Sequence, residues 1–433
     1  MRMTRDALVV LGILFVAAAA HAKPDLDPII FVHGGSGSGA QFESQAMRFA
    51  SNGYPHRYIA VLEYDSSSIG TILPAVLAEL DALIARLQAE TGREQVDLLG
   101  HSLGTFVSQT YLSTPARAAN VAHYVNIDGA GAGAPPGGVP TLALWAGASP
   151  PIDAIVGALN VTLPGQEHIE CATSAEAFFE MYHFFRGEAP ATTDILPEPP
   201  GQVSVAGRVD FFPQNTGIAG ATLEIWEVDG ATGFRKAAAP LATRLIDATG
   251  NFGPIDEVRG GKHYEFAVLR DAQVGIHYFY EPFLRSDHLL RLNVAQGLAP
   301  FIDASDDDVA LTVTRFKELC GDLGAGSDVL SINGTDVLNP TTASCATVGG
   351  GTAAFFAFDD NSDGISNVTS VPFPFGPLAF LSAADLFIPA DPPGTVSVVT
   401  VPRGEASATR TVNVPNLPSS TDRVVVQLND FEQ

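Results

Sequence analysis

Apolar residues in the first half of the chain form short continuous runs, and between these runs they recur at helical spacing. Continuous runs are typical of strands buried on both faces of a mostly parallel sheet. We predict such strands at 29–32, 58–63, 96–99, 121–127, 141–145 and 161–163. Helices are predicted between them at 41–50, 72–87, 103–112 and 174–185. This alternation predicts an α/β domain over residues 23–191.

The pattern changes after a proline-rich segment, residues 192–201, which we interpret as a linker. Beyond it, short β-branched runs alternate with glycine, aspartate, asparagine and proline, and we find no long helical pattern. We therefore predict an all-β C-terminal domain, a sandwich or barrel, over residues 202–433. A weaker seam at 299–308 allows two modules, 202–299 and 300–433.

The N-terminus is typical of an export signal. Arg2 and Arg5 precede the apolar run 7–20, and Ala20-His21-Ala22 has the small-x-small form of a cleavage site. We expect residues 1–22 to be removed and the mature protein to be periplasmic or secreted. The run is short for a membrane span, so no transmembrane segment is predicted. The formal net charge of −25 disfavours nucleic acid or an anionic membrane surface as a partner.

Gly100-His101-Ser102-Leu103-Gly104 lies between a predicted strand and a predicted helix. A G-x-S-x-G sequence in that setting is typical of a nucleophile elbow, in which flanking glycines permit a tight turn and the serine is strained. The competing interpretation, a buried helix start of small residues, is disfavoured by the α/β pattern around it. Ser102 is therefore the predicted nucleophile.

A nucleophilic serine needs a base, an orienting acid and donors for the oxyanion. The predicted base is His168, because it follows a short strand and turn, whereas His123 precedes a strand and His183 lies on an apolar helix. Two residues remain open as the acid. Asp128 ends the strand after the elbow helix, and Asp153 follows the next strand.

The turn His33-Gly34-Gly35 follows the first strand and predicts an oxyanion donor at the N–H of Gly35, with the N–H of Leu103 as the second. The glycines of residues 34–39 also resemble a phosphate loop. Their spacing is G-x-G-x-G and no lysine follows, which disfavours that interpretation.

Metal and cysteine chemistry add little. Asp359, Asn361 and Asp363 match the first half of a calcium loop, but Ser370 stands where a bidentate glutamate is needed, so a solvated turn is favoured. No cofactor is predicted. In an oxidising compartment Cys320 and Cys345 can pair, and we interpret Cys171 as a buried, unreactive thiol.

Beyond these features, the chain resembles the two-domain lipases of the Archaeoglobus fulgidus type, which join an α/β-hydrolase domain to a β domain associated with lipid substrates. The likeness includes residues 41–45, 100–105, 128–129, 168–185, 191–195 and 382–386. It implies a triad of Ser102, Asp128 and His168, with oxyanion donors at Gly35 and Leu103, and so favours Asp128 over Asp153. One feature departs from the family: the segment between Tyr64 and Ser102 is too short for a helical lid.

Together these observations predict an exported carboxylic ester hydrolase of the lipase or esterase type, acting on lipid or other acyl esters. A polyester depolymerase or acyltransferase would use the same triad and differ in the polymer or acceptor it takes. A surface-binding protein with a vestigial hydrolase domain is the non-enzymatic alternative. The complete set of serine, histidine and acid argues against it, and reaction of the serine with a fluorophosphonate discriminates the two.

Overall fold

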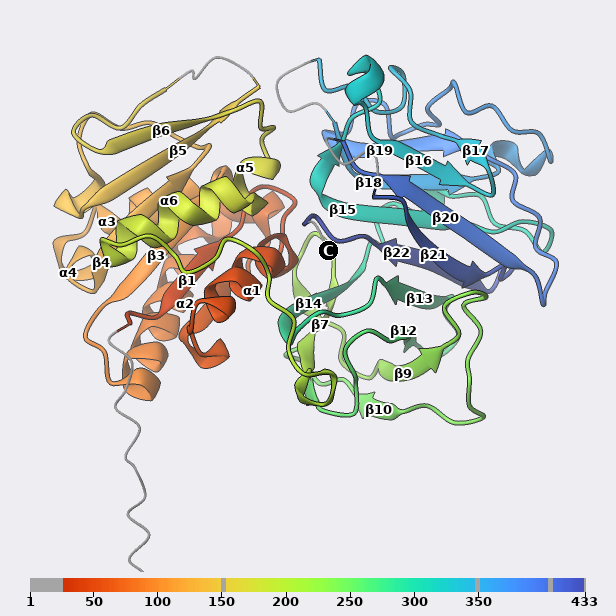
Figure 1. The fold of residues 1–433 in the computed structure, drawn as a ribbon, viewed down its shortest axis with the longest axis horizontal. Coiled ribbons are helices and arrows are strands. Elements are labelled where there is room, and N and C mark those ends of the chain that lie inside the picture. The colour runs from red at the N-terminus through yellow and green to blue at the C-terminus, as the bar shows by residue number, and fades with distance from the viewer. Residues whose placement is uncertain (1–25, 149–152, 347–350, 404–407, 432–433) are drawn as a thin grey trace, which may run out of the picture.

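A computed structural model describes residues 26–148, 153–346, 351–403 and 408–431. The predicted signal peptide, residues 1–22, and its cleavage site lie outside the described residues. Figure 1 shows an α/β part, coloured red to yellow, beside a β region coloured green to blue. The predicted fold class, α/β followed by all-β, is confirmed.

The α/β part is built on a six-stranded sheet in the order β2-β1-β3-β4-β5-β6. Every neighbouring pair in it is parallel. The strands are β1 (Ile29–Val32), β2 (Ile59–Leu62), β3 (Val96–His101), β4 (Val121–Ile127), β5 (Thr141–Gly147) and β6 (Leu159–Pro164). All residues of β1 and β3 are buried, as expected for strands covered on both faces.

Helices cover both faces of this sheet. They are α1 (Glu43–Ser51), α2 (Ile69–Thr91), α3 (Leu103–Leu112), α4 (Pro115–Ala118), α5 (Glu170–Thr173) and α6 (Ala175–Arg186). Helices α1, α5 and α6 pack into one apolar core, and α2 and α3 into the core on the other face. Helix α2 ends at Gly92, whose φ of 71° makes the left-handed cap that glycine favours.

Helix α2 also bears on the membrane prediction. Within the described residues, the segment Ser66–Thr91 is long and apolar enough to cross a membrane by length and composition alone. The core helix of a soluble protein passes the same test. The apolar stripe of α2 packs against the sheet and forms part of the core on that face. Its buried residues include Val76, Leu80, Ile84 and Leu87.

Sixteen described strands make up the β region. They are β7 (Val205–Phe211), β8 (Thr216–Gly217), β9 (Thr222–Val228), β10 (Ala242–Leu245), β11 (Asn251–Ile255), β12 (His263–Leu269), β13 (Gly275–Tyr280), β14 (Asp287–Val294), β15 (Leu311–Leu319), β16 (Val329–Ile332), β17 (Thr335–Asp336), β18 (Thr352–Phe358), β19 (Phe380–Asp385), β20 (Thr395–Val401), β21 (Arg410–Pro415) and β22 (Asp422–Gln427). Short 3₁₀ helices across the chain are Gly39–Phe42, His56–Tyr58, Ser66–Ser68, Pro136–Gly138, Pro200–Gln202, Ala299–Phe301, Gly324–Gly326 and Asp360–Ser362.

One eight-stranded sheet, β10-β9-β12-β13-β22-β15-β18-β19, runs through the whole β region. The last described strand, β22, lies in the middle of this sheet. It pairs in parallel with β13 on one side and with β15 on the other. Two smaller sheets pack with it: β11-β7-β14, to which β8 adds, and β17-β16-β20-β21. The C-terminal strand thus joins the residues before and after the 299–308 seam.

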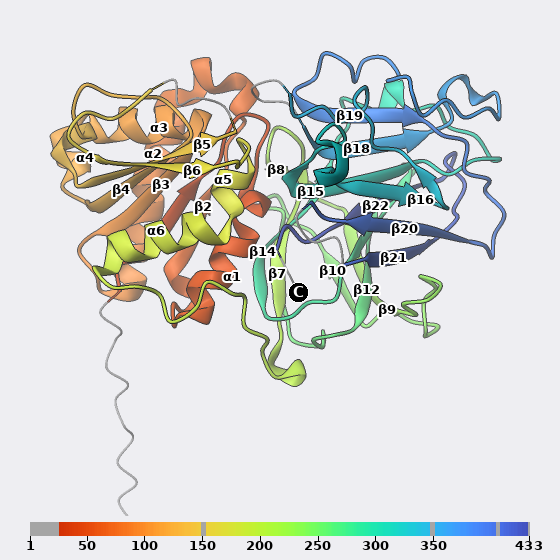
Figure 2. The ribbon, with the colours of Figure 1, turned by 45° about the horizontal axis from the view of Figure 1, so that its top comes forward.

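The β region lies against loops that follow strands of the parallel sheet. Helix α1 contacts β14 and α5 contacts β15, and both views place α5 beside β15 (Figure 1 and Figure 2). A buried ion pair, 2.6 Å between Arg291 of β14 and Glu63 after β2, links the two parts. Loops after parallel strands are where sites form in open α/β sheets, so the β region reaches the expected position of a site.

Candidate active site

The G-x-S-x-G segment forms a sharp turn between β3 and α3. Ser102 has φ 52° and ψ −121°, a conformation that residues with side chains rarely adopt. A Cβ on Gly100 would lie 2.6 Å from the carbonyl oxygen of Gly104. One on Gly104 would lie 2.2 Å from that of Val32. Both positions require glycine, which is the local geometry expected of a nucleophile elbow.

Asp128 and His168 form a polar pair. Oδ2 of Asp128 lies 2.6 Å from Nδ1 of His168, and Oδ1 accepts the N–H of Ala146 at 2.9 Å. Burial raises the pKa of Asp128, but the hydrogen bonds from His168 and Ala146 outweigh burial and bring this pKa below its usual range. An ionised carboxylate on Nδ1 keeps the proton there and leaves Nε2 of the imidazole as an acceptor.

The other candidates for acid and base have different partners. Oδ2 of Asp153 accepts the N–H of Gly131 at 2.9 Å, which ties together the loops after β4 and β5. His123 bonds Asp97 at 2.8 Å, and His183 stacks on Phe179 of the same helix. The structure brings Asp128 to His168 and does not bring Asp153 there.

The turn after β1 lies against the elbow. A Cβ on Gly34 would be 2.9 Å from Cβ of Ser102, so the backbone of this turn passes next to the serine. Leu103 is the first residue of α3, where the N–H groups of a helix have no partner within the helix. Within the residues that the structure describes, the N–H groups of Gly35 and Leu103 donate to no other residue. Both donors are thus available to a developing oxyanion.

His101 connects the elbow to the His168 loop, a connection that the sequence did not predict. Its Nε2 lies 2.9 Å from the carbonyl oxygen of His168, and its Nδ1 lies 2.5 Å from Nε2 of Gln41. A carbonyl only accepts and an amide nitrogen only donates, so Nε2 carries the proton. Burial and the nearby His168 lower the pKa of His101 to about 3, which keeps this ring neutral. The one signal for this role in the sequence was that His101, a polar residue, ends the apolar strand β3.

Two side chains of the β region reach the same loops. Nδ2 of Asn215, between β7 and β8, lies 2.8 Å from the carbonyl oxygen of Gly37 and 3.2 Å from Nε2 of His33, both in the turn after β1. The ring of Phe380, the first residue of β19, stacks on the imidazole of His168 with 5.6 Å between centroids. No local pattern in the sequence marks either residue.

Of the three cysteines, Cys171 contacts the His168 loop, because its Sγ lies 3.1 Å from the carbonyl oxygen of His168. The candidate calcium residues hold a turn of their own. Oδ2 of Asp359 accepts the N–H of Gly364 at 2.9 Å, and Oδ1 of Asp363 accepts that of Ile365 at 2.8 Å, so both carboxylates hold a turn. Cys320 and Cys345 form a disulfide, and Cys171 is buried. In the described part of the chain, one group of His, Cys, Asp or Glu side chains has the spacing to hold a metal. Two of its three members are the disulfide cysteines, which have no free thiolate to offer.

Comparison with solved structures finds a chain described as a "predicted CIB-like hydrolase" from Thermoplasma acidophilum, 16% identical, with a TM-score of 0.27, covering 37% of this chain and 86% of that one. No curated protein matches the chain. Three family models match in succession: class 2 lipase over residues 26–117, lipase C-terminal domain over 201–297, and a further C-terminal domain over 297–432. The first match includes Ser102 and the turn at Gly35. The three matches thus give this chain the domain order of a two-domain lipase, an α/β-hydrolase domain followed by C-terminal β domains.

Proposed function

We propose that this protein is an exported carboxylic ester hydrolase of the lipase or esterase type, with Ser102 as its nucleophile. The observations that carry the proposal are the strained Ser102 turn and the 2.6 Å pair of His168 and Asp128, which the 2.9 Å contact of His101, the neighbour of Ser102, with the carbonyl oxygen of His168 brings together. The class 2 lipase match over residues 26–117 supports the reaction class. Export rests on the signal-like residues 1–22.

The proposed mechanism follows from the proton positions. Nδ1 of His168 carries a proton toward Asp128, so Nε2 accepts the Ser102 proton as the oxygen attacks the ester carbonyl. The carbonyl oxygen becomes an oxyanion that the N–H groups of Gly35 and Leu103 stabilise. The imidazolium then protonates the leaving alcohol. Water, deprotonated by the same histidine, releases the acid from the acyl-enzyme.

Replacement of the nucleophile tests this proposal. Ser102→Ala removes the attacking oxygen and should lower turnover of p-nitrophenyl esters by roughly 10⁶-fold. Ser113→Ala is the matched control, because Ser113 is an exposed serine at the other end of α3, and it should hydrolyse esters as the wild type does. Retention of more than a few per cent of activity by folded Ser102→Ala protein would exclude the mechanism. Rates across esters of increasing chain length would define the acyl preference.

A further inference from the structure

The backbone just after His168 is held by a side chain from the β region. Glu318, near the end of β15, accepts the N–H of Ile169 at 2.5 Å with one carboxylate oxygen and that of Glu170 at 3.0 Å with the other. These are the next two residues after His168. The carbonyl of His168 itself is bonded by His101 and by the thiol of Cys171 at 3.1 Å. Consecutive peptide groups of the histidine loop are thus fixed from two domains.

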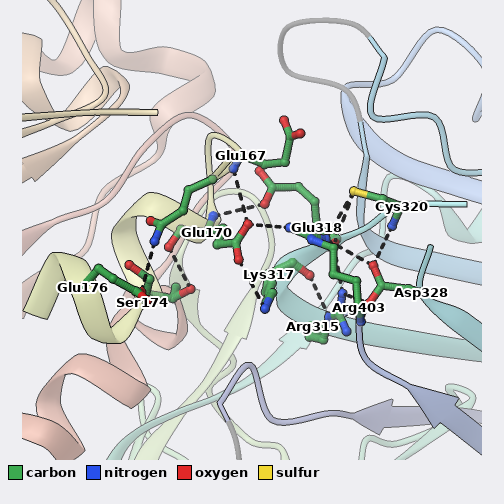
Figure 3. Close-up of polar contacts among 12 residues, drawn as sticks. Glu167, Glu170, Ser174, Glu176, Arg315, Lys317, Glu318, Cys320, Asp328 and Arg403 are labelled. Carbon is green, nitrogen blue, oxygen red and sulfur yellow. Dashed lines mark hydrogen bonds and ion pairs between the residues drawn. The ribbon is translucent and has the colours of Figure 1, made fainter. Parts of the chain in front are cut away.

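A network of buried charges aims the Glu318 side chain. Arg315 donates to the backbone carbonyl of Glu318 at 2.8 Å, and Arg403 donates to the same carbonyl. Both arginines also bond Asp328, at 2.8 and 3.1 Å (Figure 3). Asp328 in turn accepts the N–H of Cys320 at 2.9 Å. The main chain that carries Glu318 is therefore rigidly placed, and Figure 3 shows the side chain extending from it toward Glu170.

Other contacts from the same β strands reinforce this position. The Glu170 carboxylate binds Lys317 at 3.2 Å and Arg403 at 2.5 Å. The Phe380 ring covers the imidazole of His168. The His168 loop is thus held at three points by residues of the β region. These residues lie on β15, on β19 and, for Arg403, just after β20.

The surroundings of Glu318 are unfavourable for an ionised carboxylate. Its side chain is fully buried, and among the described residues no lysine or arginine forms an ion pair with its carboxylate. Burial raises the pKa of Glu318, and the N–H donors together with the positive charge of Arg403 offset this only in part. A carboxyl whose pKa is raised on folding costs stability when it is ionised at neutral pH. A buried residue kept at such a cost is expected where function requires it.

We propose that Glu318 is a positioning residue for ester hydrolysis, which fixes the loop of the catalytic histidine through the N–H groups of Ile169 and Glu170. This inference rests on the proposed function of His168. If Glu318 has this role, the β region influences kcat by fixing the backbone that carries His168, the general base. A displacement of about 1 Å at a catalytic group is enough to cost roughly 100-fold in rate.

The test is Glu318→Gln. The amide keeps one acceptor oxygen but turns an NH₂ group toward the second N–H, so one hydrogen bond is replaced by a clash of donors. On a short soluble p-nitrophenyl ester, kcat should fall by about 10- to 100-fold while KM stays within twofold of the wild-type value. Reaction of Ser102 with a fluorophosphonate should slow by a similar factor.

Glu198→Gln is the matched control. Glu198, in the linker, binds Arg285 and Ser286 of the β region at 2.9 Å, and its hydrogen-bond partners among the described residues include none of the His168 loop. The same isosteric change there should leave kcat at the wild-type value. Titration of active sites with the fluorophosphonate separates positioning from loss of structure. A positioning defect leaves every site titratable but slow, whereas unfolding removes sites and leaves normal kcat at those that remain.

Glu318→Asp is the second variant, since it keeps the charge but withdraws the carboxylate by one methylene. It should also lose kcat per titrated site. The inference is overturned if the titrated sites of both variants turn over within twofold of the wild type. Wild-type protein that neither hydrolyses esters nor reacts at Ser102 would instead overturn the proposed function, and this inference with it.

Discussion

His277, in the middle of the eight-stranded sheet, should make the stability of the β region depend on pH. Its Nδ1 lies 2.6 Å from Glu265 on β12, and its Nε2 lies 2.7 Å from Asp422 on β22. A carboxylate on each ring nitrogen favours the doubly protonated ring. Burial lowers the pKa of His277, but the two carboxylates outweigh burial and raise it to about 9.

The sign and size of the effect follow by linkage. The folded-state pKa of about 9 lies above the ordinary value of 6.5, so the stabilisation is complete below pH 6.5 and is lost as pH rises through 9. Each pKa unit is worth about 1.4 kcal/mol, so the free energy of unfolding should lose about 3 kcal/mol over this window from His277 alone. His277→Gln removes the titrating group. The difference in free energy of unfolding between wild type and variant should therefore shrink by about 3 kcal/mol from pH 6 to pH 10.

Urea unfolding followed by tryptophan fluorescence measures this difference. Trp226 on β9 lies in the same sheet, and a Trp145→Phe background removes the second tryptophan, which lies on β5. His263→Gln is the control, because His263 lies on β12, the strand next to that of His277, but burial lowers its pKa. Its difference from the wild type should stay constant above pH 6.5. A difference for His277→Gln that does not change between pH 6 and pH 10 would refute the reasoning.

Three further predictions concern the site and its surroundings. Asp128→Asn should lower turnover by about 10⁴-fold because it favours the wrong tautomer of His168, while Asp153→Asn should change it little; the reverse ranking in steady-state assays would assign the acid to Asp153. A chelator should shift the melting temperature by no more than a degree or two, because the Asp359 and Asp363 carboxylates already hold a turn, and a fall of many degrees would reveal a calcium site. Tributyrin hydrolysis should follow saturation kinetics through the solubility limit, because α2 is needed to cover the sheet and leaves no helix for a lid. A jump in rate at that limit would show a mobile cover, with the β region beside His168 its nearest source.

Local sequence signals predicted the α/β part well. Strand 121–127 and helix 103–112 occur at the predicted residues, because each is an uninterrupted run with the periodicity of its own element. The glycines of the elbow predicted its turn because side chains would not fit there. A Cβ on Gly104, for example, would lie 2.2 Å from the carbonyl oxygen of Val32. Such features depend on neighbours along the chain, so they are legible without a structure.

The features that were missed depend on contacts between distant segments. Strand β11 contains glycine and proline in five residues, and β8 and β17 have two residues each, so none has a readable period. Strand β22 pairs with β13 on one side and β15 on the other, and this position depends on the packing of the whole β region rather than on local sequence. Glu318 lies 149 residues from Ile169, and no local pattern distinguishes it from a surface glutamate. The sequence therefore pointed to the α/β part of the candidate site, whereas the contacts that the β region supplies had no local signal.

The central claim is that Ser102 is an activated nucleophile in the folded protein, and covalent labelling tests it most directly. Folded wild-type protein is treated with a fluorophosphonate, the adduct is mapped by peptide mass spectrometry, and residual hydrolysis of a p-nitrophenyl ester is measured on the same samples. We predict one adduct, on Ser102, and loss of hydrolysis in proportion to labelling. Folded protein that stays unlabelled, or that continues to hydrolyse the ester once Ser102 is fully labelled, would contradict the claim.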